Sequence, residues 1–487
     1  MLSFMECTDF YKTDHRRQME SGTTRILENF TPRAGRIKGV DRVAFLGLDA
    51  HLKYDLTDLA NDTFFSRPKR HVLYEYESLM DSSLGPNGIG IEHIAALHDM
   101  QYLPLEYCAL PEGTLVPYKI PMFTVENTHD DFAWVQGYLE SLSSSRLWQC
   151  CTSATLAHRF RRMLDCYAGM TGGDLEFVKW QGHDFSFRGM PGPEAAAMSG
   201  IGHLASFKGT DTIPALRIIR DVYGGKGMIG GSVPATEHMV MCLGGKETEI
   251  ETFRRLLKLY PTGIVSIVSD TWDLWHVLTQ ILPQLKDEIM AREGKLVIRP
   301  DSGDPVKILT GDMQADSRHP AHKGVVECQW DVFKGSRNAL GFRSLDSHIG
   351  SIYGDSITYE RGEEICKRLA DKGFVSTSSV LGIGSYSYQY VTRDTHGFAV
   401  KATWAKVRGE ERMLFKDPIT DDGVKKSARG RLVVVNNYGE AALIDGLTYD
   451  QEKRYVFNQL QPVWRNGRFI KRNSWADVEK RLSTGST

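Results

Sequence analysis

The chain has 487 residues, of which 41% are hydrophobic and 25% are charged, and its formal net charge at pH 7 is −2. This composition is typical of a soluble globular protein, and the length predicts at least two domains rather than one core. Because the charge is nearly balanced, the chain has no global basic field and we expect no nucleic-acid partner, although this charge is compatible with local anion pockets.

The eight cysteines are spread along the chain without a C-x-x-C pair. This spacing argues against a zinc site and favours free thiols in a reducing compartment. The N-terminal residues lack the basic start and apolar run of a signal peptide, and no stretch approaches the ~20 apolar residues that a membrane span needs. We therefore expect a cytoplasmic protein that does not contact a membrane.

The first third of the chain changes character twice. Residues 1–100 mix short helical and extended patterns, and residues 104–128 predict a small β element because Pro and Gly turns separate short apolar runs. Over residues 132–168 the apolar side chains recur at helical spacing. We expect the chain to enter a second domain here.

From residue 176 to residue 400, strand-like runs alternate with helical stretches. The strand-like runs are 177–178, 263–268, 296–298 and 374–376, and the helical stretches are 194–207, 213–223, 271–285 and 357–372. Such alternation predicts β/α units around a largely parallel sheet or barrel. The loops that follow the strands then converge on one face, where a phosphate is frequently bound.

Beyond residue 401 the sequence is strand-like and rich in lysine and arginine, and it ends in an amphipathic segment near residues 475–482. A solvated face is the plainer interpretation of these cations.

Residues 296–305 combine a short buried strand with a polar loop. Arg299-Pro300 ends the strand, because proline cannot donate to a central ladder. The loop then offers a guanidinium for a phosphate, the carboxylates of Asp301 and Asp304 for ribose hydroxyls or Mg²⁺, and a Ser-Gly pair that an anion can approach. The pattern predicts a sugar-phosphate site, while a charged surface turn explains it equally well.

Residues 230–238 predict a helix start, with two glycines, Ser232 and Pro234 before a run of small residues. His238 then lies in or near the first helical turn. It could donate to a phosphate or attack one, with Glu237 or Asp270 orienting the ring. The alternative is a histidine with only a structural role.

Residues 183–189 predict a binding surface if their backbone is extended. Phe185, Phe187 and Gly189 would then share one face, and Ser186 and Arg188 the other. The face could supply a ring that stacks on a heteroaromatic group, with an arginine for a phosphate. Core packing of both phenylalanines is the alternative.

Three further polar loops follow apolar runs. Asp211 is placed to accept hydrogen bonds, although a helix N-cap is the simpler role. Gly354-Asp355 and Gly384-Ser385 can each present backbone N–H groups to an anion.

In this order, the segments resemble those of the type II phosphoribosyltransferases. The matching pieces are residues 8–12, 111–113, 123–128, 183–185, 188–189, 207–212, 232–238, 268–270, 298–303, 354–355, 392–394 and 415–418. The resemblance implies an α/β fold with an irregular β/α barrel as the catalytic domain, over residues 141–399. It also implies a flanking β-rich α+β domain built from residues 1–140 and 400–487.

The resemblance further implies a reaction. Nicotinamide and phosphoribosyl pyrophosphate would give nicotinamide mononucleotide and pyrophosphate, with Mg²⁺ present and with ATP hydrolysis coupled through a phosphorylated histidine. His238 matches that histidine, Asp270 would orient it, and Asp301 matches the carboxylate that holds the ribose directly or through Mg²⁺ and water.

Substrate contacts are implied in the same way. Arg188 and Arg299 would hold pyrophosphate, and Phe185 would form one wall of the pyridine slot. Asp211 would accept the amide N–H₂ of nicotinamide and repel the carboxylate of nicotinate. The cradle for the 5′-phosphate is matched by Gly354, Asp355, Gly384, Ser385 and Arg393.

The other wall of the slot is matched by Tyr11 from a second subunit, so the resemblance implies a homodimer with shared sites. The cations that reach the phosphates are matched by Arg33, Lys401, Lys416 and Lys425. Gly384-Ser385-Tyr386 stands where the family has three glycines, Trp180 and Trp272 stand where we expect tyrosines, and residues 306–350 match poorly. A nicotinate-preferring enzyme and a non-catalytic binding paralogue are the alternatives.

Overall fold

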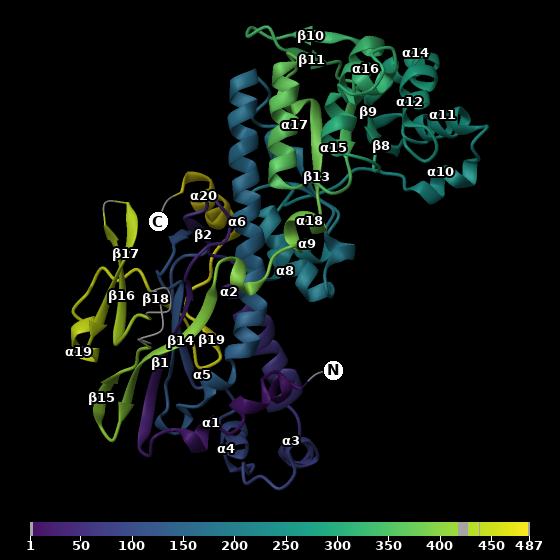
Figure 1. Ribbon diagram of the computed structural model, residues 1–487. Coiled ribbons are helices and arrows are strands. Elements are labelled where there is room, and N and C mark those ends of the chain that lie inside the picture. The colour runs from purple at the N-terminus through teal and green to yellow at the C-terminus, as the bar shows by residue number, and fades with distance from the viewer. Residues whose placement is uncertain (1–2, 417–426, 438, 486–487) are drawn as a thin grey trace. The chain divides into compact units, whose positions relative to one another are not determined.

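A computed structural model describes residues 3–416, 427–437 and 439–485. The chain divides into two compact units (Figure 1). Unit 1 comprises Met1–Thr155, Arg217–Lys226 and Val391–Thr487, and unit 2 comprises Leu156–Leu216 and Gly227–Tyr390. Helices α6 (Glu140–Thr171) and α9 (Ile213–Tyr223) contribute residues to both units. Lys425 lies outside the described residues.

Unit 1 is organised around a seven-stranded sheet in which every neighbouring pair is antiparallel. The strands, in sheet order, are β15 (Glu410–Met413), β14 (Phe398–Val407), β1 (Thr23–Pro32), β5 (Phe123–Asn127), β3 (Leu105–Ala109), β18 (Gln461–Arg465) and β19 (Arg468–Phe469). The N-terminal strand β1 lies beside the C-terminal strand β14 (Figure 1). The two ends of the chain therefore build one β-rich unit, as the sequence predicted.

Aromatic packing explains why these distant segments pair. The ring of Phe30 on β1 stacks on Phe398 of β14, with centroids 5.0 Å apart, and on Phe123 of β5, with centroids 5.3 Å apart. All three rings are buried. Because such pairs contribute both apolar area and ring contacts, they join β1 to both neighbouring strands.

Smaller elements surround this sheet in unit 1. The remaining strands are β2 (Arg42–Ala44), β4 (Leu115–Pro117), β16 (Arg431–Asn437) and β17 (Glu440–Leu447). The helices include α1 (His15–Gln18), α2 (Leu48–Lys53), α3 (Lys69–Leu84), α4 (Glu92–Met100), α5 (Val135–Tyr138), α19 (Tyr449–Glu452) and α20 (Trp475–Thr484).

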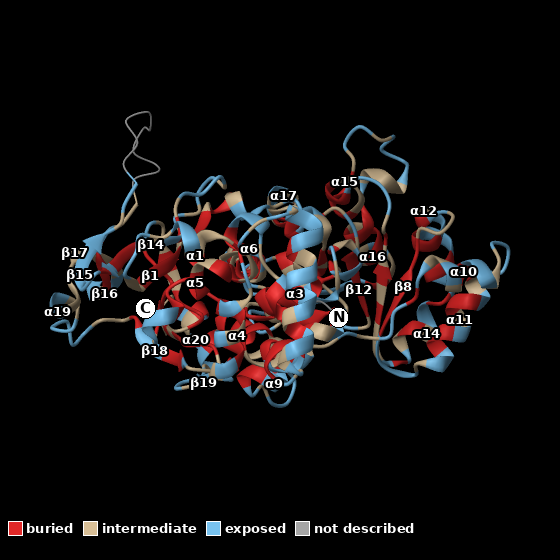
Figure 2. Cartoon of the chain, turned by 90° about the horizontal axis from the view of Figure 1, so that it is seen from below, coloured by how far each residue is buried: buried red, intermediate tan, exposed pale blue. Residues whose placement is uncertain are grey.

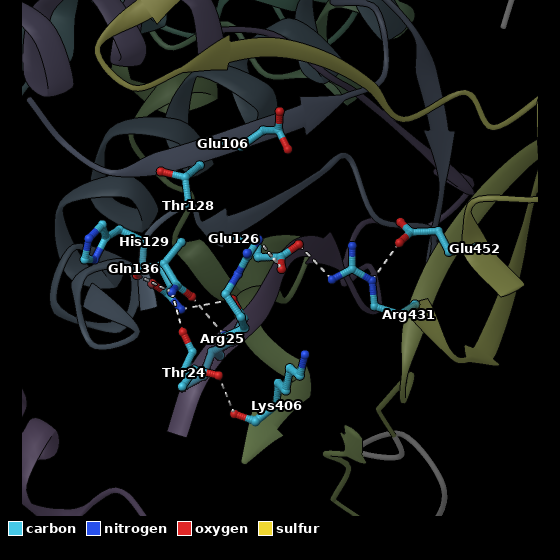
Figure 3. A network of polar contacts seen from close by, with 12 residues as sticks. Thr24, Arg25, Glu106, Glu126, Thr128, His129, Gln136, Lys406, Arg431 and Glu452 are labelled. Carbon is cyan, nitrogen blue, oxygen red and sulfur yellow. Dashed lines mark hydrogen bonds and ion pairs between the residues drawn. The ribbon is translucent and has the colours of Figure 1, made fainter. Parts of the chain in front are cut away.

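A buried ion network ties the β16–β17 hairpin to the sheet (Figure 3). Glu126 on β5 pairs with Arg25 of β1 at 2.8 Å and with Arg431 of β16 at 2.7 Å. Arg431 in turn pairs with Glu452 of α19 at 2.6 Å. The side chains of Arg431 and Glu126 are only 7% and 9% exposed, so each charge depends on its partners for solvation.

Unit 2 holds a parallel sheet. Its strands, in sheet order, are β7 (Gly209–Thr210), β6 (Gly182–Asp184), β13 (Ser379–Ile383), β12 (Ile349–Tyr353), β9 (Glu293–Arg299) and β8 (Thr262–Val268). Strand β12 is buried at every position, whereas the surrounding helices such as α11 (Glu249–Leu259) carry one buried and one exposed face (Figure 2). This burial pattern is typical of a sheet covered by helices.

Residues 231–236 connect the two edges of this sheet. The Thr210 N–H donates to the Gly231 carbonyl at 3.0 Å, next to β7, and the Thr236 N–H donates to the Ser266 carbonyl of β8 at 3.0 Å. Both contacts belong to parallel bridges, Gly209 with Gly231 and Ala235 with Ser266. The strands therefore follow one another around a ring in chain order, which is the irregular β/α barrel that we predicted.

The helices of unit 2 follow the strands along the chain. They include α7 (Val178–Gln181), α8 (Pro193–Leu204), α10 (His238–Gly244), α11, α12 (Leu274–His276), α13 (Leu282–Gln284), α14 (Lys286–Met290), α15 (Pro305–Thr310), α16 (Val325–Phe333), α17 (Tyr359–Asp371) and α18 (Ser385–Tyr388). A hairpin of β10 (Gly335–Arg337) and β11 (Arg343–Leu345) lies between α16 and β12 in sequence. Among the described residues, none of the helices combines the length and the apolar character that crossing a membrane requires.

Two predicted strands were wrong. Val178 begins the short helix α7, and the strand follows at Gly182–Asp184, where small and polar residues are buried between β7 and β13. Residues 374–376 make only an isolated bridge and enter a 3₁₀ turn, before β13 starts at Ser379. In both places the position of the neighbouring strands overrides local β propensity.

We predict that Glu126→Ala lowers the free energy of unfolding by about 3 kcal/mol, because it removes one of the two carboxylates of the buried Arg431 and the partner of the half-buried Arg25. Chemical unfolding followed by tryptophan fluorescence measures the change. Asp99→Ala, which removes an exposed partner of Lys69, is the matched control and should cost less than about 1 kcal/mol. Equal losses in the two variants would contradict a stabilising role for the buried network.

Candidate active site

The candidate site lies in unit 2, where seven loops begin at the carboxyl ends of neighbouring strands. They contribute Phe185 and Arg188 after β6, Asp211 after β7, His238 after residues 231–236, Asp270 after β8, Asp301 after β9, Gly354 and Asp355 after β12, and Gly384 and Ser385 after β13. Because parallel strands end at the same edge, these residues share one rim, as they do in β/α barrels.

His238 is held beside two carboxylates. Its Nδ1 atom lies 3.1 Å from the hydroxyl of Thr271, and its Nε2 atom lies 4.0 Å from Asp270 Oδ1 and 3.8 Å from Asp301 Oδ2. His238 is the first residue of α10, and 45% of its side chain is exposed. A solvent-accessible histidine with one nitrogen hydrogen-bonded can use the other nitrogen as a base or a nucleophile.

Asp270 joins the β8 and β9 loops. Its Oδ2 atom accepts the Asp301 N–H at 2.7 Å and the Ser302 hydroxyl at 2.6 Å. Its Oδ1 atom is buried, has no hydrogen-bond partner in the part of the chain that the structure describes, and lies 4.0 Å from His238 Nε2. The orienting role of Asp270 stays a prediction, since Thr271 makes the only hydrogen bond to the His238 ring that the described residues provide.

Arg299 lies between an aromatic ring and a carboxylate. Its guanidinium is 5.4 Å from the ring centroid of Phe185, and its Nη2 atom is 3.8 Å from Asp301 Oδ2. The Nη1 atom donates to the Thr236 carbonyl at 3.3 Å, while the buried Nε–H has no hydrogen-bond partner among the described residues. An arginine with an unsatisfied donor at a rim of this kind is suited to bind an anion.

The extended backbone predicted for residues 183–189 was wrong beyond Asp184. Phe185 donates its N–H to the Ile383 carbonyl at 3.0 Å, and residues 187–189 then form a 3₁₀ turn. The alternation of faces is lost, so Arg188 is exposed on that turn and Phe185 is half-buried at the rim. Phe185 and Arg188 still lie on one loop. Their placement follows from the 3₁₀ turn of that loop, and the predicted alternation along a strand does not account for it.

Asp211 accepts a hydrogen bond from a buried histidine. His183 Nε2 lies 3.0 Å from Asp211 Oδ1. Burial acts to raise the pKa of Asp211, but the hydrogen bonds from His183 and Ser232 and the nearby positive charge of Arg299 outweigh it, so the pKa lies below its usual range. Asp211 is therefore an ionised acceptor at neutral pH.

The two glycine loops pack tightly against the other site residues. A Cβ atom on Gly354 would lie 2.7 Å from Asp301 Oδ1, so only glycine lets the carboxylate take this position. Ser385 begins α18, and its hydroxyl lies against the backbone of Gly189. Ser356, which follows Gly354-Asp355, has φ of +51°, a conformation that non-glycine residues rarely adopt outside functional loops.

The remaining predicted residues belong to unit 1. Tyr11 is 62% exposed on a 3₁₀ turn. Arg33 donates to the Gly397 carbonyl at 2.9 Å, and Lys401 lies 3.9 Å from Glu140. Arg393 and Lys416 are exposed. That these side chains reach the rim of unit 2 stays a prediction.

Sequence reasoning gave no role to Thr271 and His183 and missed the side-chain contact of Ser302, although each of the three touches a predicted residue. Thr271 and Ser302 directly follow Asp270 and Asp301, so their position in the chain was a usable signal. His183 gave no such signal, because its partner Asp211 is 28 residues away and the contact depends on β6 and β7 being neighbours.

A comparison with protein families places this rim in a known context. The model of the nicotinate phosphoribosyltransferase (NAPRTase) family matches residues 180–468, which include every strand of the parallel sheet in unit 2 and the closing residues 231–236. A nicotinamide phosphoribosyltransferase of Acinetobacter baylyi is 47% identical, over 98% of this chain and 97% of that protein. The chain belongs to the nicotinate phosphoribosyltransferase family.

Three further similar proteins share less sequence identity with this chain. A nicotinamide phosphoribosyltransferase of Mycoplasma pneumoniae is 31% identical, over 88% of this chain and 95% of that protein. Among solved structures, nicotinate-nucleotide pyrophosphorylase from Pyrococcus furiosus aligns with a TM-score of 0.59 at 14% identity, over 99% of this chain and 95% of that one. Human nicotinic acid phosphoribosyltransferase aligns with a TM-score of 0.55 at 14% identity, over 98% and 93%. The two alignments confirm the predicted fold class.

We predict that Gly382→Ala displaces the ring of Phe185. The new Cβ atom would lie 2.6 Å from the Phe185 ring and 2.6 Å from the Tyr353 carbonyl, so the free energy of unfolding should fall by roughly 1–3 kcal/mol. A crystal structure and chemical unfolding measure both effects. Gly169→Ala, in an open position of helix α6, is the control and should not destabilise. An unmoved ring at unchanged stability would show that the packing is looser than described.

Proposed function

We propose that this chain is a nicotinamide phosphoribosyltransferase of NAD salvage. It joins nicotinamide to phosphoribosyl pyrophosphate and releases nicotinamide mononucleotide and pyrophosphate. The observation that carries the proposal is the rim of unit 2, where an aromatic ring, an ionised acceptor and an arginine–carboxylate pair lie together. The name of the relative that is 47% identical supports the same reaction.

The reaction exchanges one bond at the anomeric carbon. The pyridine nitrogen of nicotinamide forms a bond to C1′ of the ribose as the bond from C1′ to the pyrophosphate oxygen breaks, and the electron pair leaves with pyrophosphate. Positive charge develops on the sugar and negative charge on the leaving group. Asp301 stabilises the first, and Arg188 and Arg299 stabilise the second.

The ring of nicotinamide stacks on Phe185, and its amide N–H₂ donates to Asp211. An ionised Asp211 favours this amide over the carboxylate of nicotinate, which it repels. Gly354, Asp355, Gly384, Ser385 and Arg393 form the cradle of the 5′-phosphate.

A homodimer with shared sites completes the slot. Tyr11 of a second subunit covers the other face of the pyridine ring, and Arg33, Lys401, Lys416 and Lys425 supply cations to the phosphates. The exposure of Tyr11 supports this arrangement. Residues 1–140 and 400–487 form the flanking domain and residues 141–399 the catalytic domain.

If the two subunits share their sites, mixing Tyr11→Ala subunits with Asp301→Ala subunits restores up to about one quarter of the wild-type activity. The absence of any recovery in this mixture contradicts shared sites.

The carboxylates of the rim fit Mg²⁺. Among the described residues there is no cluster of three or more metal-ligating side chains. Mg²⁺ is nevertheless commonly held by one or two carboxylates together with substrate phosphates and water, and Asp301 and the unpartnered Oδ1 atom of Asp270 are such oxygens. When bound, Mg²⁺ would neutralise pyrophosphate charge.

ATP acts through His238. In the tautomer in which the Nδ1–H of the ring donates to the Thr271 hydroxyl, the lone pair of Nε2 is available for attack. Nε2 forms a bond to the γ-phosphorus of ATP while the bond to ADP breaks, and water later hydrolyses the phosphohistidine. The contact with Thr271 and the accessibility of the ring support this role.

The direct experiment incubates the protein with nicotinamide, nicotinate, phosphoribosyl pyrophosphate and Mg²⁺, with and without ATP, and identifies the products by mass spectrometry. Nicotinamide mononucleotide should dominate. Dominant nicotinate mononucleotide would show a nicotinate-preferring enzyme and would overturn the role of Asp211. If neither mononucleotide forms and nicotinamide still binds, the protein is a non-catalytic paralogue.

We predict that His238→Ala keeps the fold and basal transfer but loses the stimulation by ATP, because no nitrogen remains to accept the phosphoryl group. Initial rates with and without ATP measure this, and labelled γ-phosphate should stay off the variant. His71→Ala, an exposed histidine on α3, is the control and should behave as the wild type. Full ATP stimulation in His238→Ala would remove the phosphohistidine from the mechanism.

A further inference from the structure

We propose that His183 is a positioning residue that sets the preference for nicotinamide over nicotinate by holding Asp211 in place. This inference rests on the proposed function. To that function the inference adds a side chain that acts through Asp211 and does not contact the substrate itself.

His183 is the central residue of β6, and 9% of it is exposed. Its ring packs against that of Phe185, with centroids 4.6 Å apart, and its Nε2 lies 3.0 Å from Asp211 Oδ1. Because a carboxylate oxygen can only accept, Nε2 carries the proton and donates. One side chain thus contacts both the ring and the acceptor proposed to bind nicotinamide.

The ring of His183 has little freedom to move. A Cβ atom on Gly209, the neighbouring residue on β7, would lie 2.7 Å from His183 Nδ1. The Gly209 carbonyl accepts from His203 Nε2 at 2.9 Å, and the Tyr388 hydroxyl donates to His203 Nδ1 at 2.7 Å. Burial lowers the pKa of His203 to about 4, so this histidine is neutral and uses both nitrogens in these bonds. A buried chain of contacts therefore supports the strand edge on which His183 rests.

The charged and polar groups that face Asp211 are His183 from β6, Ser232 from the closing segment and Arg299 from β9. Hydrogen bonds from the first two leave further lone pairs on the carboxylate, and 45% of the Asp211 side chain is exposed. It can therefore accept an amide N–H while His183 keeps its orientation. Without the donor, the pKa of Asp211 rises, and a protonated Asp211 can donate to the carboxylate of nicotinate.

The test compares three substitutions. His183→Phe keeps the ring shape and removes the donor, His183→Gln places an amide N–H near the position of Nε2, and His183→Asn places one near Nδ1, too far from Asp211. We expect His183→Phe and His183→Asn to raise the KM of nicotinamide about tenfold at nearly unchanged kcat, and to lower the nicotinamide-to-nicotinate ratio of kcat/KM about tenfold. His183→Gln should bring both the KM of nicotinamide and the nicotinamide-to-nicotinate ratio of kcat/KM most of the way back to the wild-type values.

The pH dependence gives a second reading. The hydrogen bond from His183 lowers the pKa of Asp211, so its loss raises that pKa. The KM of nicotinamide should then begin to rise at a higher pH in His183→Phe than in the wild type as the pH is lowered. His348→Phe, which removes a histidine from a His–Asp pair at the amino end of β12, is the matched control and should change neither value.

The outcomes separate this inference from the function on which it rests. A wild-type protein without nicotinamide transfer contradicts the proposed function. A wild-type protein that transfers nicotinamide, with an unchanged substrate ratio in His183→Phe, contradicts only the role of His183. If His183→Phe does not fold, the comparison of His183→Gln with His183→Asn decides, and equal ratios in these two variants overturn the inference.

Discussion

The closure of the parallel sheet by residues 231–236 is the constraint on which the candidate site depends. Backbone hydrogen bonds join this segment to β7 on one side and to β8 on the other. Without them the chain between Thr210 and Thr262 would leave an open edge, and His238 would have no fixed position. With them, the histidine follows the closing segment directly and meets the loop of its neighbour β8, which carries Asp270 and Thr271.

Asp270 has a similar role between the next two loops. By accepting from the backbone of Asp301 and the hydroxyl of Ser302, it fixes the β9 loop to the β8 loop. Asp301 is thereby held within 4 Å of both His238 and Arg299. His238, which we propose accepts a phosphoryl group, and Asp301, which we propose stabilises the ribosyl cation, therefore lie next to each other. This contact would give a physical route for coupling ATP to transfer.

Much of this rim was predictable because its residues follow apolar runs. Arg299-Pro300-Asp301 ends a clear strand, and Gly354-Asp355 and Gly384-Ser385 each follow one. The contact of His183 with Asp211 was not predictable, since it joins residues on two very short strands with little β propensity. The curl of residues 187–189 was missed for a related reason, because period-two alternation can be read into any short run of mixed residues.

The sequence by itself determined the class of fold, the order of the β/α units and the residue types available for phosphate, ribose and ring. These depend on local apolar periodicity and on short segments that resemble a family. Only the tertiary structure decided which donors meet which acceptors: Thr271 with His238, His183 with Asp211, and Ser302 with Asp270. Such contacts depend on which strands are neighbours and on where each loop turns. A hydrogen bond forms only when donor and acceptor are about 3 Å apart, so a change in either the strand order or the loop path would break it.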